Sequence, residues 1–195
     1  MGFKTEIDYL VPRLSIPGVG EYKNARFELR PADTQRVARW GWDKNPFSDS
    51  RELRGLKIMM AMINNWDLKD ENTAVLARDG KLFYIVSDNG SSFGKLADKS
   101  MSRAGRSVNK PNDFAKANFI KGVNQNVIEL DYRGMNEKIM NGITIEDGRW
   151  LADRLVQLSD KQIEDAFRAA NYTPEEVQVL TNATRARINQ LTSLQ

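Results

Sequence analysis

Four side chains in the middle of this chain have the types and spacing that phosphoryl transfer requires. Asp67, Lys69 and Asn72 form a D-x-K-x-x-N pattern within "NNWDLKDEN", and Asp88 lies between the apolar run "FYIVS" and "NG". The reaction needs a carboxylate to accept a proton from the attacking hydroxyl, oxygen ligands for Mg²⁺, and a cation near the phosphoryl group. We predict Asp67 as the base, Lys69 as the cation, and Asn72 and Asp88 as Mg²⁺ ligands.

Gly90 completes this predicted site, because a residue without a side chain would let the chain turn away from the metal. The alternative interpretation of residues 64–72 is a solvated helix end, since charged helix ends often carry Asp and Asn at this spacing. A catalytic site is favoured over a solvated helix end by the leucine and lysine within the pattern. A later strand that ends in Asp-x-Gly favours it as well. Asp70 and Glu71 then become surface spacers.

Composition narrows the chemistry further, because the 195 residues include neither cysteine nor histidine. Disulfides, thiolate and imidazole metal sites, cysteine nucleophiles and a histidine base are therefore excluded. Any bound metal would be a hard cation held by oxygen atoms. With 41% apolar residues, the chain can bury the core of about one domain.

Charge and hydropathy predict a soluble protein with no membrane span. The apolar runs are shorter than a bilayer requires, and the first ten residues lack the pattern of a signal peptide. We expect the chain as given to be cytoplasmic, although a longer form could be exported. The net charge of +3 is too small to predict nucleic acid as a partner.

One segment is far more basic than the rest. Residues 91–111 contain a single acidic residue and five basic ones: Lys95, Lys99, Arg103, Arg106 and Lys110. The segment has no hydrophobic periodicity, which predicts a long loop. It could attract an acidic or phosphorylated substrate, or it could be an ordinary solvated loop.

Regular elements are expected on both sides of the predicted site. Residues 1–48 are typical of strand and loop, with a turn in "SIPGVGEY". Three aromatic residues there are expected to anchor a packed loop: Trp40, Trp42 and Phe47. Apolar spacing predicts a helix over residues 51–64, and two β-rich runs around Asp79-Gly80 predict a hairpin.

The remainder is predicted to be mostly helical. A short helix at residues 113–120 and a strand at residues 126–132 come first. Three helices follow, and "SDKQ" at Ser159 and "TPEE" at Thr173 are capping signals for the second and third. The arginines of the third helix are expected on a solvated face: Arg185 and Arg187.

The stretch "WDLKDENTAVL" resembles the catalytic loop of the protein kinase superfamily, in which HRDLKxxN precedes apolar residues. "VSDNG" is similar to the DFG motif of that family. The preceding helix and the intervening hairpin also match the large lobe of these enzymes in order and approximate length. A nearer resemblance is to bacterial proteins of unassigned function that carry "NNWDLKDxN" and "VSDLGxxFG", close to the atypical HipA and phosphoinositide kinase branches.

This resemblance implies an α+β fold, a kinase-like C-terminal lobe that is mainly helical with a small β-hairpin. It also implies a phosphotransferase that uses ATP and Mg²⁺. Carried over by position, it gives the same roles as the residue types: catalysis at Asp67 and Lys69, nucleotide contact at Lys69 and Gly90, and metal ligation at Asn72 and Asp88.

Three residues depart from the family motifs. Asn65 replaces the histidine of HRD, Trp66 replaces its arginine, and Asn89 replaces the phenylalanine of DFG. Because Trp66 stands at the arginine position, regulation by an arginine that binds a phosphorylated activation loop is not expected. Because Asn89 stands at the phenylalanine position, the usual packing of the DFG phenylalanine is not expected either.

The resemblance further implies that most of the small lobe is missing. That lobe carries a glycine-rich loop, an ATP-binding lysine and its glutamate partner, and the 66 residues before Asp67 are too few for it. We divide the chain into an interlobe remnant over residues 1–48 and the lobe over residues 49–195. Catalysis should be weak or absent unless upstream sequence or another chain supplies the small lobe. The alternative is a non-catalytic pseudokinase or an interaction module that binds an acidic partner through residues 95–110.

Overall fold

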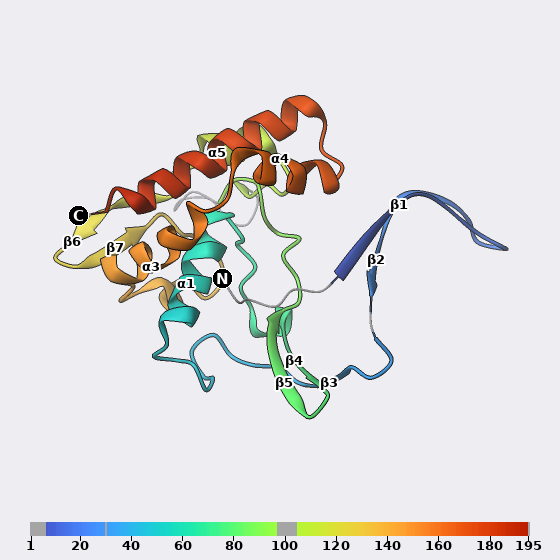
Figure 1. Cartoon of the computed structure of the whole chain (residues 1–195), viewed down its shortest axis with the longest axis horizontal. Helices are drawn as coiled ribbons and strands as arrows, with labels where there is room; N and C mark the ends of the chain where they lie inside the picture. Colours follow the sequence, from blue (N-terminus) through green and yellow to red (C-terminus); the bar gives the residue numbers. More distant parts are fainter. Residues whose placement is uncertain (1–6, 30, 97–104, 195) are drawn as a thin grey trace.

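The computed structural model describes residues 7–29, 31–96 and 105–194 (Figure 1). In these ranges the chain is an α+β protein, with small antiparallel sheets beside a helical body. The mixed class expected from the sequence is confirmed. The β-structure extends beyond the single expected hairpin, because two further strand pairs and an added third strand are present.

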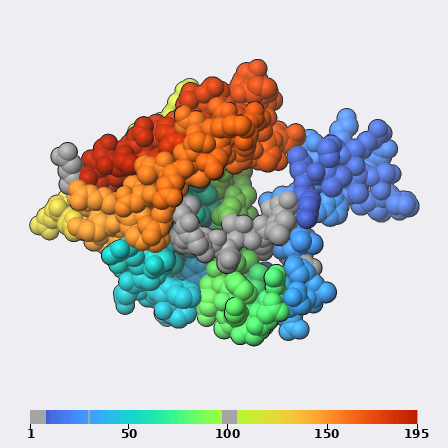
Figure 2. Space-filling view, viewed as in Figure 1, coloured from blue at the N-terminus to red at the C-terminus, as the bar shows by residue number. Residues whose placement is uncertain are grey.

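The chain begins with a long hairpin that projects from the helical body (Figure 2). It consists of β1 (Ile7–Ile16) and β2 (Gly20–Leu29), and none of its described side chains is buried. The turn predicted in "SIPGVGEY" is confirmed, because Val19 N donates to Ile16 O at 3.0 Å and Gly18 has a φ of 74°.

A three-stranded sheet supports the predicted site. It has the order β3 (Gln35–Ala38), β4 (Thr73–Arg78) and β5 (Lys81–Val86). The predicted hairpin is confirmed, and both Asp79 and Gly80 have positive φ, as a tight two-residue turn between strands requires. The expected division after residue 48 cuts through this sheet, because β3 precedes that point and pairs with β4 after it.

Helix α1 (Arg51–Met62) leads into the predicted site. The Ser50 hydroxyl caps its first turn by accepting from Leu53 N at 3.1 Å. The predicted helix over residues 51–64 is thus confirmed, with an end two residues earlier. Asn64, at a φ of 54°, turns the chain out of the helix.

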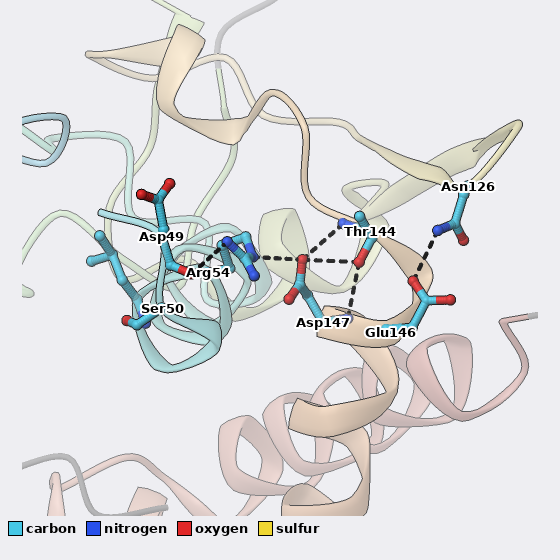
Figure 3. Close-up of polar contacts among 8 residues, drawn as sticks. Asp49, Ser50, Arg54, Asn126, Thr144, Glu146 and Asp147 are labelled. Carbon is cyan, nitrogen blue, oxygen red and sulfur yellow. Dashed lines mark hydrogen bonds and ion pairs between the residues drawn. The ribbon is translucent and has the colours of Figure 1, made fainter. Parts of the chain in front are cut away.

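Helix α3 (Ile145–Leu155) packs against α1 and is joined to it by an ion pair (Figure 3). Asp147 Oδ2 lies 2.8 Å from Arg54 Nε and also accepts from Thr144 N and Thr144 Oγ1, each at 3.0 Å. The Asp147 side chain is almost fully buried. One carboxylate therefore both caps α3 and fixes α1 against it.

Replacing Asp147 by alanine should lower the free energy of unfolding by about 2–3 kcal/mol, because the cap is lost and the guanidinium of Arg54 loses its carboxylate. Urea denaturation would measure the change. Glu146→Ala is the matched control, since Glu146 is exposed and its carboxylate accepts from the exposed Asn126 side chain at 2.9 Å (Figure 3). Equal losses in both variants would contradict this account of Asp147.

The remaining elements form the C-terminal part of the body. They are α2 (Pro111–Lys116), β6 (Ile120–Asn124), β7 (Val127–Leu130), α4 (Asp160–Ala169) and α5 (Pro174–Thr192). The helix starts predicted at Ser159 and Thr173 are confirmed, and a capping box is present at each. The helix expected at residues 113–120 begins and ends earlier, because the chain after Lys116 straightens and forms β6, the unpredicted partner of β7.

Helix α5 runs along one side of the body and contacts α2, α3 and α4 (Figure 1). Leu180, Ile188 and Leu191 on this helix have no exposed surface and form the centre of the core with Leu151 and Ile58. None of the helices in the described ranges combines the length and apolar character needed to cross a bilayer.

Candidate active site

The polar loop starts at Asn64, whose side chain holds the chain in place at the end of α1. Asn64 is 1% exposed; its Nδ2 donates to Gly94 O at 2.8 Å, and its Oδ1 accepts from Arg187 Nη1 at 2.9 Å. The next side chain, Asn65, accepts from Asp67 N at 3.1 Å. These bonds set the direction in which the loop leaves the helix.

Asp67, Lys69 and Asn72 lie together, as their spacing predicts. Asn72 Nδ2 donates to Asp67 Oδ2 at 3.0 Å and to Asp67 O at 2.8 Å, and Lys69 Nζ lies 3.0 Å from the same Oδ2. Asp67 and Asn72 are each 9% exposed. Within the described residues, no hydrogen bond or ion pair is formed by Asp67 Oδ1, so this oxygen is available to accept a hydrogen bond.

Asp70 and Glu71 are exposed, as expected of spacers, but Asp70 also has a structural role. Its Oδ1 accepts from Trp42 N at 3.3 Å, and its backbone oxygen accepts from Thr73 Oγ1 at 2.8 Å. The loop is thereby joined to the segment that carries Trp40 and Trp42, which are 6% and 1% exposed. The predicted aromatic anchors are confirmed at these two positions, whereas Phe47 is 40% exposed.

The second polar stretch lies beside the first. Ser87 N donates to Asn72 O at 2.8 Å, one residue beyond the Thr73–Val86 pair of the β4–β5 ladder. Asp88 follows directly and is exposed, and its Oδ1 accepts from Gly90 N at 2.8 Å. The hairpin therefore returns the chain from Asn72 to Asp88, and Asp88 Oδ2 has no partner in the described ranges.

Gly90 follows Asp88 and Asn89 in the second polar stretch. Its φ is not positive, so the turn needs no glycine-specific conformation. A side-chain carbon at this position would lie 3.1 Å from Asp88 Oδ1. The absence of a side chain keeps space open beside the Asp88 carboxylate.

Two of the positions that depart from the kinase motifs contact each other. Asn65 Nδ2 donates to Asn89 Oδ1 at 3.1 Å, and the adjacent Trp66 N donates to Ser91 O at 3.3 Å. Together with the Ser87–Asn72 bond, these hydrogen bonds join residues 64–72 to residues 87–91 at both ends of the two stretches. A hydrogen-bonded amide pair therefore occupies these two positions.

The donor set fits a magnesium ion. Asn72 uses its amide nitrogen on Asp67, which leaves the amide oxygen for a cation, and Asp88 offers a carboxylate oxygen. Mg²⁺ commonly takes only one or two carboxylates from the protein and completes its shell with water and phosphate oxygens. The described residues contain no group of three or more acidic side chains arranged as a metal cage, which such a site does not need.

Sequence reasoning missed a cluster beside Asp67. The guanidinium of Arg106 lies 4.8 Å from the ring centre of Trp66, and Arg106 Nη2 donates to Arg133 O at 3.3 Å. Tyr132 is 2% exposed, and burial raises its pKa; Arg106 opposes this effect, whereas Asp67 adds to it. Phenol, guanidinium and the Asp67 carboxylate therefore interact electrostatically, and no local motif connects them.

The prediction that Arg187 lies on a solvated face is wrong. It is 3% exposed rather than solvated, and burial lowers its pKa to about 10, so it remains a cation at neutral pH. Arg185, which was predicted to share that solvated face, does lie nearer the surface. Its Nε donates to Asp160 Oδ1 at 2.7 Å. A weak signal existed, because Arg187 lies four residues after Ala183 and four before Leu191, both buried, and so shares their face of α5.

An open pocket of about 980 Å³ lies on another side of the polar loop. It is lined by Asp70, Trp42, Lys57 and residues 136–139, among others, and by none of Asp67, Lys69, Asn72 or Asp88. The predicted chemical groups therefore do not open into this pocket.

The chain was compared with protein-family models, curated proteins and solved structures, and no match was found in any of the three.

Proposed function

We propose that this chain is a kinase-like phosphotransferase domain that binds ATP with Mg²⁺ through the two polar stretches. The observation that carries the proposal is the joint arrangement of Asp67, Lys69 and Asn72, hydrogen-bonded at 2.8 Å to the strand end that leads to Asp88. A solvated helix end would not bury a carboxylate and an amide against each other.

Each residue then has a defined role. The oxygen of the acceptor hydroxyl forms a bond to the γ-phosphorus, and the bond from the γ-phosphorus to the departing ADP oxygen breaks. Asp67 Oδ1 accepts the proton that the hydroxyl loses. Lys69, bonded to the other oxygen of Asp67, provides positive charge for the phosphoryl group. Asn72 and Asp88 would hold Mg²⁺, which would neutralise charge on the phosphates when bound.

Nucleotide binding is tested most directly by thermal unfolding with Mg²⁺ and ADP. At about one hundred times Kd, binding should stabilise the protein by about 2.7 kcal/mol, which raises the Tm by roughly 5–10 °C at this chain length. Asp88→Ala should abolish the rise and leave the Tm without nucleotide nearly unchanged, because Asp88 is exposed.

Asp153→Ala serves as the control, since Asp153 is an exposed carboxylate on α3. It should keep the full Tm shift. The proposal fails if millimolar Mg²⁺ and ADP give no shift in the unaltered protein, or if the shift survives Asp88→Ala.

A nucleotide-binding role without catalysis is the second candidate. It is favoured by the ion pair between Lys69 and Asp67, in which the cation already neutralises the carboxylate that would act as base. Such a protein would show the same Tm shift but would release no ADP from ATP in the presence of hydroxyl acceptors.

A further inference from the structure

The open pocket of about 980 Å³ is lined by a lysine from α1. The side chain of Lys57 is half-buried in the pocket wall, to which Trp42 and Ile139 also contribute. Among the residues that the structure describes, Lys57 Nζ forms no hydrogen bond or ion pair, yet this atom is not sealed from solvent. A pocket of this size suits a small molecule, and a molecule that enters would meet this amine.

A fixed cation lies one turn before Lys57 on α1. Arg54 Nε lies 2.8 Å from Asp147 Oδ2, and Arg54 Nη1 donates to Asp49 O at 3.0 Å, so its guanidinium is held in position (Figure 3). Residues three apart on a helix are neighbours on its surface. Burial lowers the pKa of Lys57, the charge of Arg54 lowers it further, and Asp43 opposes both effects. The amine therefore loses its proton more readily than a lysine in water.

The other charged groups of the pocket leave this amine available. They are Asp43, Asp70, Glu137 and Lys138. In the described ranges none of the three carboxylates forms an ion pair with Lys57. Asp43 and Glu137 are exposed, so water screens their charges. Burial and a neighbouring cation are the two features that activate a lysine as a nucleophile, and Lys57 has both.

The basic segment singled out by the sequence differs from Lys57 in this respect. Its lysines Lys95 and Lys110 are exposed, and the guanidinium of Arg106 stays protonated. Lys99 and Arg103 lie outside the described residues. The burial that favours a neutral amine at Lys57 is therefore missing at the two described lysines of that segment.

We propose that Lys57 is a nucleophilic amine that captures small aldehydes as imines in this pocket. Nζ forms a bond to the carbonyl carbon, and one of its protons passes to the carbonyl oxygen, which becomes a hydroxyl. The bond from carbon to this hydroxyl then breaks, the second proton of Nζ passes to the hydroxyl through solvent, and water leaves. A double bond between nitrogen and carbon remains. This activity is separate from the proposed phosphotransfer, because neither Asp67 nor Asp88 lines the pocket.

Reductive alkylation tests the proposal directly. The whole chain is treated with propionaldehyde and cyanoborohydride at about pH 7, and peptide mass spectrometry locates the label. Among the lysines, Lys57 should carry most of the label when about one per chain has reacted. The α-amino group is counted separately, because its ordinary pKa is already low. At about pH 10 the preference for Lys57 should shrink, since ordinary lysines then also begin to lose their protons.

Two lysines serve as internal controls. Lys138 lines the same pocket but is exposed, and Lys81 is exposed on the β4–β5 hairpin. Lys57→Arg should remove most of the lysine label, whereas Lys138→Arg should leave it nearly unchanged. Asp43→Asn should speed labelling at Lys57, because the negative charge that favours its protonated form is lost. The inference is overturned if Lys57 is labelled no faster than both control lysines at about pH 7, or if Asp43→Asn slows its labelling.

Discussion

Replacing Arg187 by methionine is expected to lower the free energy of unfolding by about 3–5 kcal/mol, although the new side chain is apolar and similar in length. The guanidinium donates to four oxygens: Met62 O, Asn64 Oδ1, Phe114 O and Ala117 O. It also stacks 4.0 Å from the ring centre of Phe114. The methionine would leave these acceptors buried without donors.

Arg185→Met supplies a matched comparison two residues away on the same helix. Arg185 pairs with an exposed carboxylate, so its loss should cost less than about 1 kcal/mol. Guanidinium chloride denaturation of both variants measures the difference. Losses of equal size would show that the Arg187 network contributes little.

The Arg187 network also concerns function, because one of its acceptors is Asn64. Without the donor from Arg187, the side chain that fixes the start of the polar loop loses a partner, and the position of Asp67 becomes less defined. Arg187→Lys, which keeps the charge but cannot reach all four oxygens, should have an intermediate stability. A buried residue on α5 thus helps to position a loop that is distant in sequence.

Asp67→Asn should reduce phosphotransfer by about 10²–10⁴-fold, the usual contribution of a general base. The amide has nearly the same shape as the carboxylate but cannot accept the proton. The Mg²⁺ and ADP shift in Tm should persist, because Asn72 and Asp88 are unchanged. Release of ADP from ATP, followed with a coupled assay, gives the rate, and thermal unfolding gives the binding.

Glu71→Gln is the control for this change, since Glu71 is an exposed carboxylate of the same loop. It should retain the rate of the unaltered protein. If Asp67→Asn instead abolished the Tm shift as well, Asp67 would act by holding Lys69 and Asn72 in place, and the base would have to be another group.

Local sequence determined the elements around the site. Ser50 before an apolar repeat begins α1, and Asp79-Gly80 between β-rich runs forms the hairpin, because capping and tight turns depend on residues a few positions apart. The same holds for the helices that open at Ser159 and Thr173. The grouping of Asp67, Lys69 and Asn72 is also local, since all three lie in one short loop.

Tertiary structure alone decided which distant residues complete the site. The Asn65–Asn89 bond, the stacking of Arg106 on Trp66, and the burial of Arg187 join segments 24 or more positions apart. In the sequence the amides and arginines of these contacts are polar residues, whose types predict exposure. Only tertiary packing brings the donors and acceptors together in an interior without water. Leaving them unpaired there would cost free energy. The sequence by itself thus determined the candidate chemical groups, and the fold decided how they are held and which cation lies beside them.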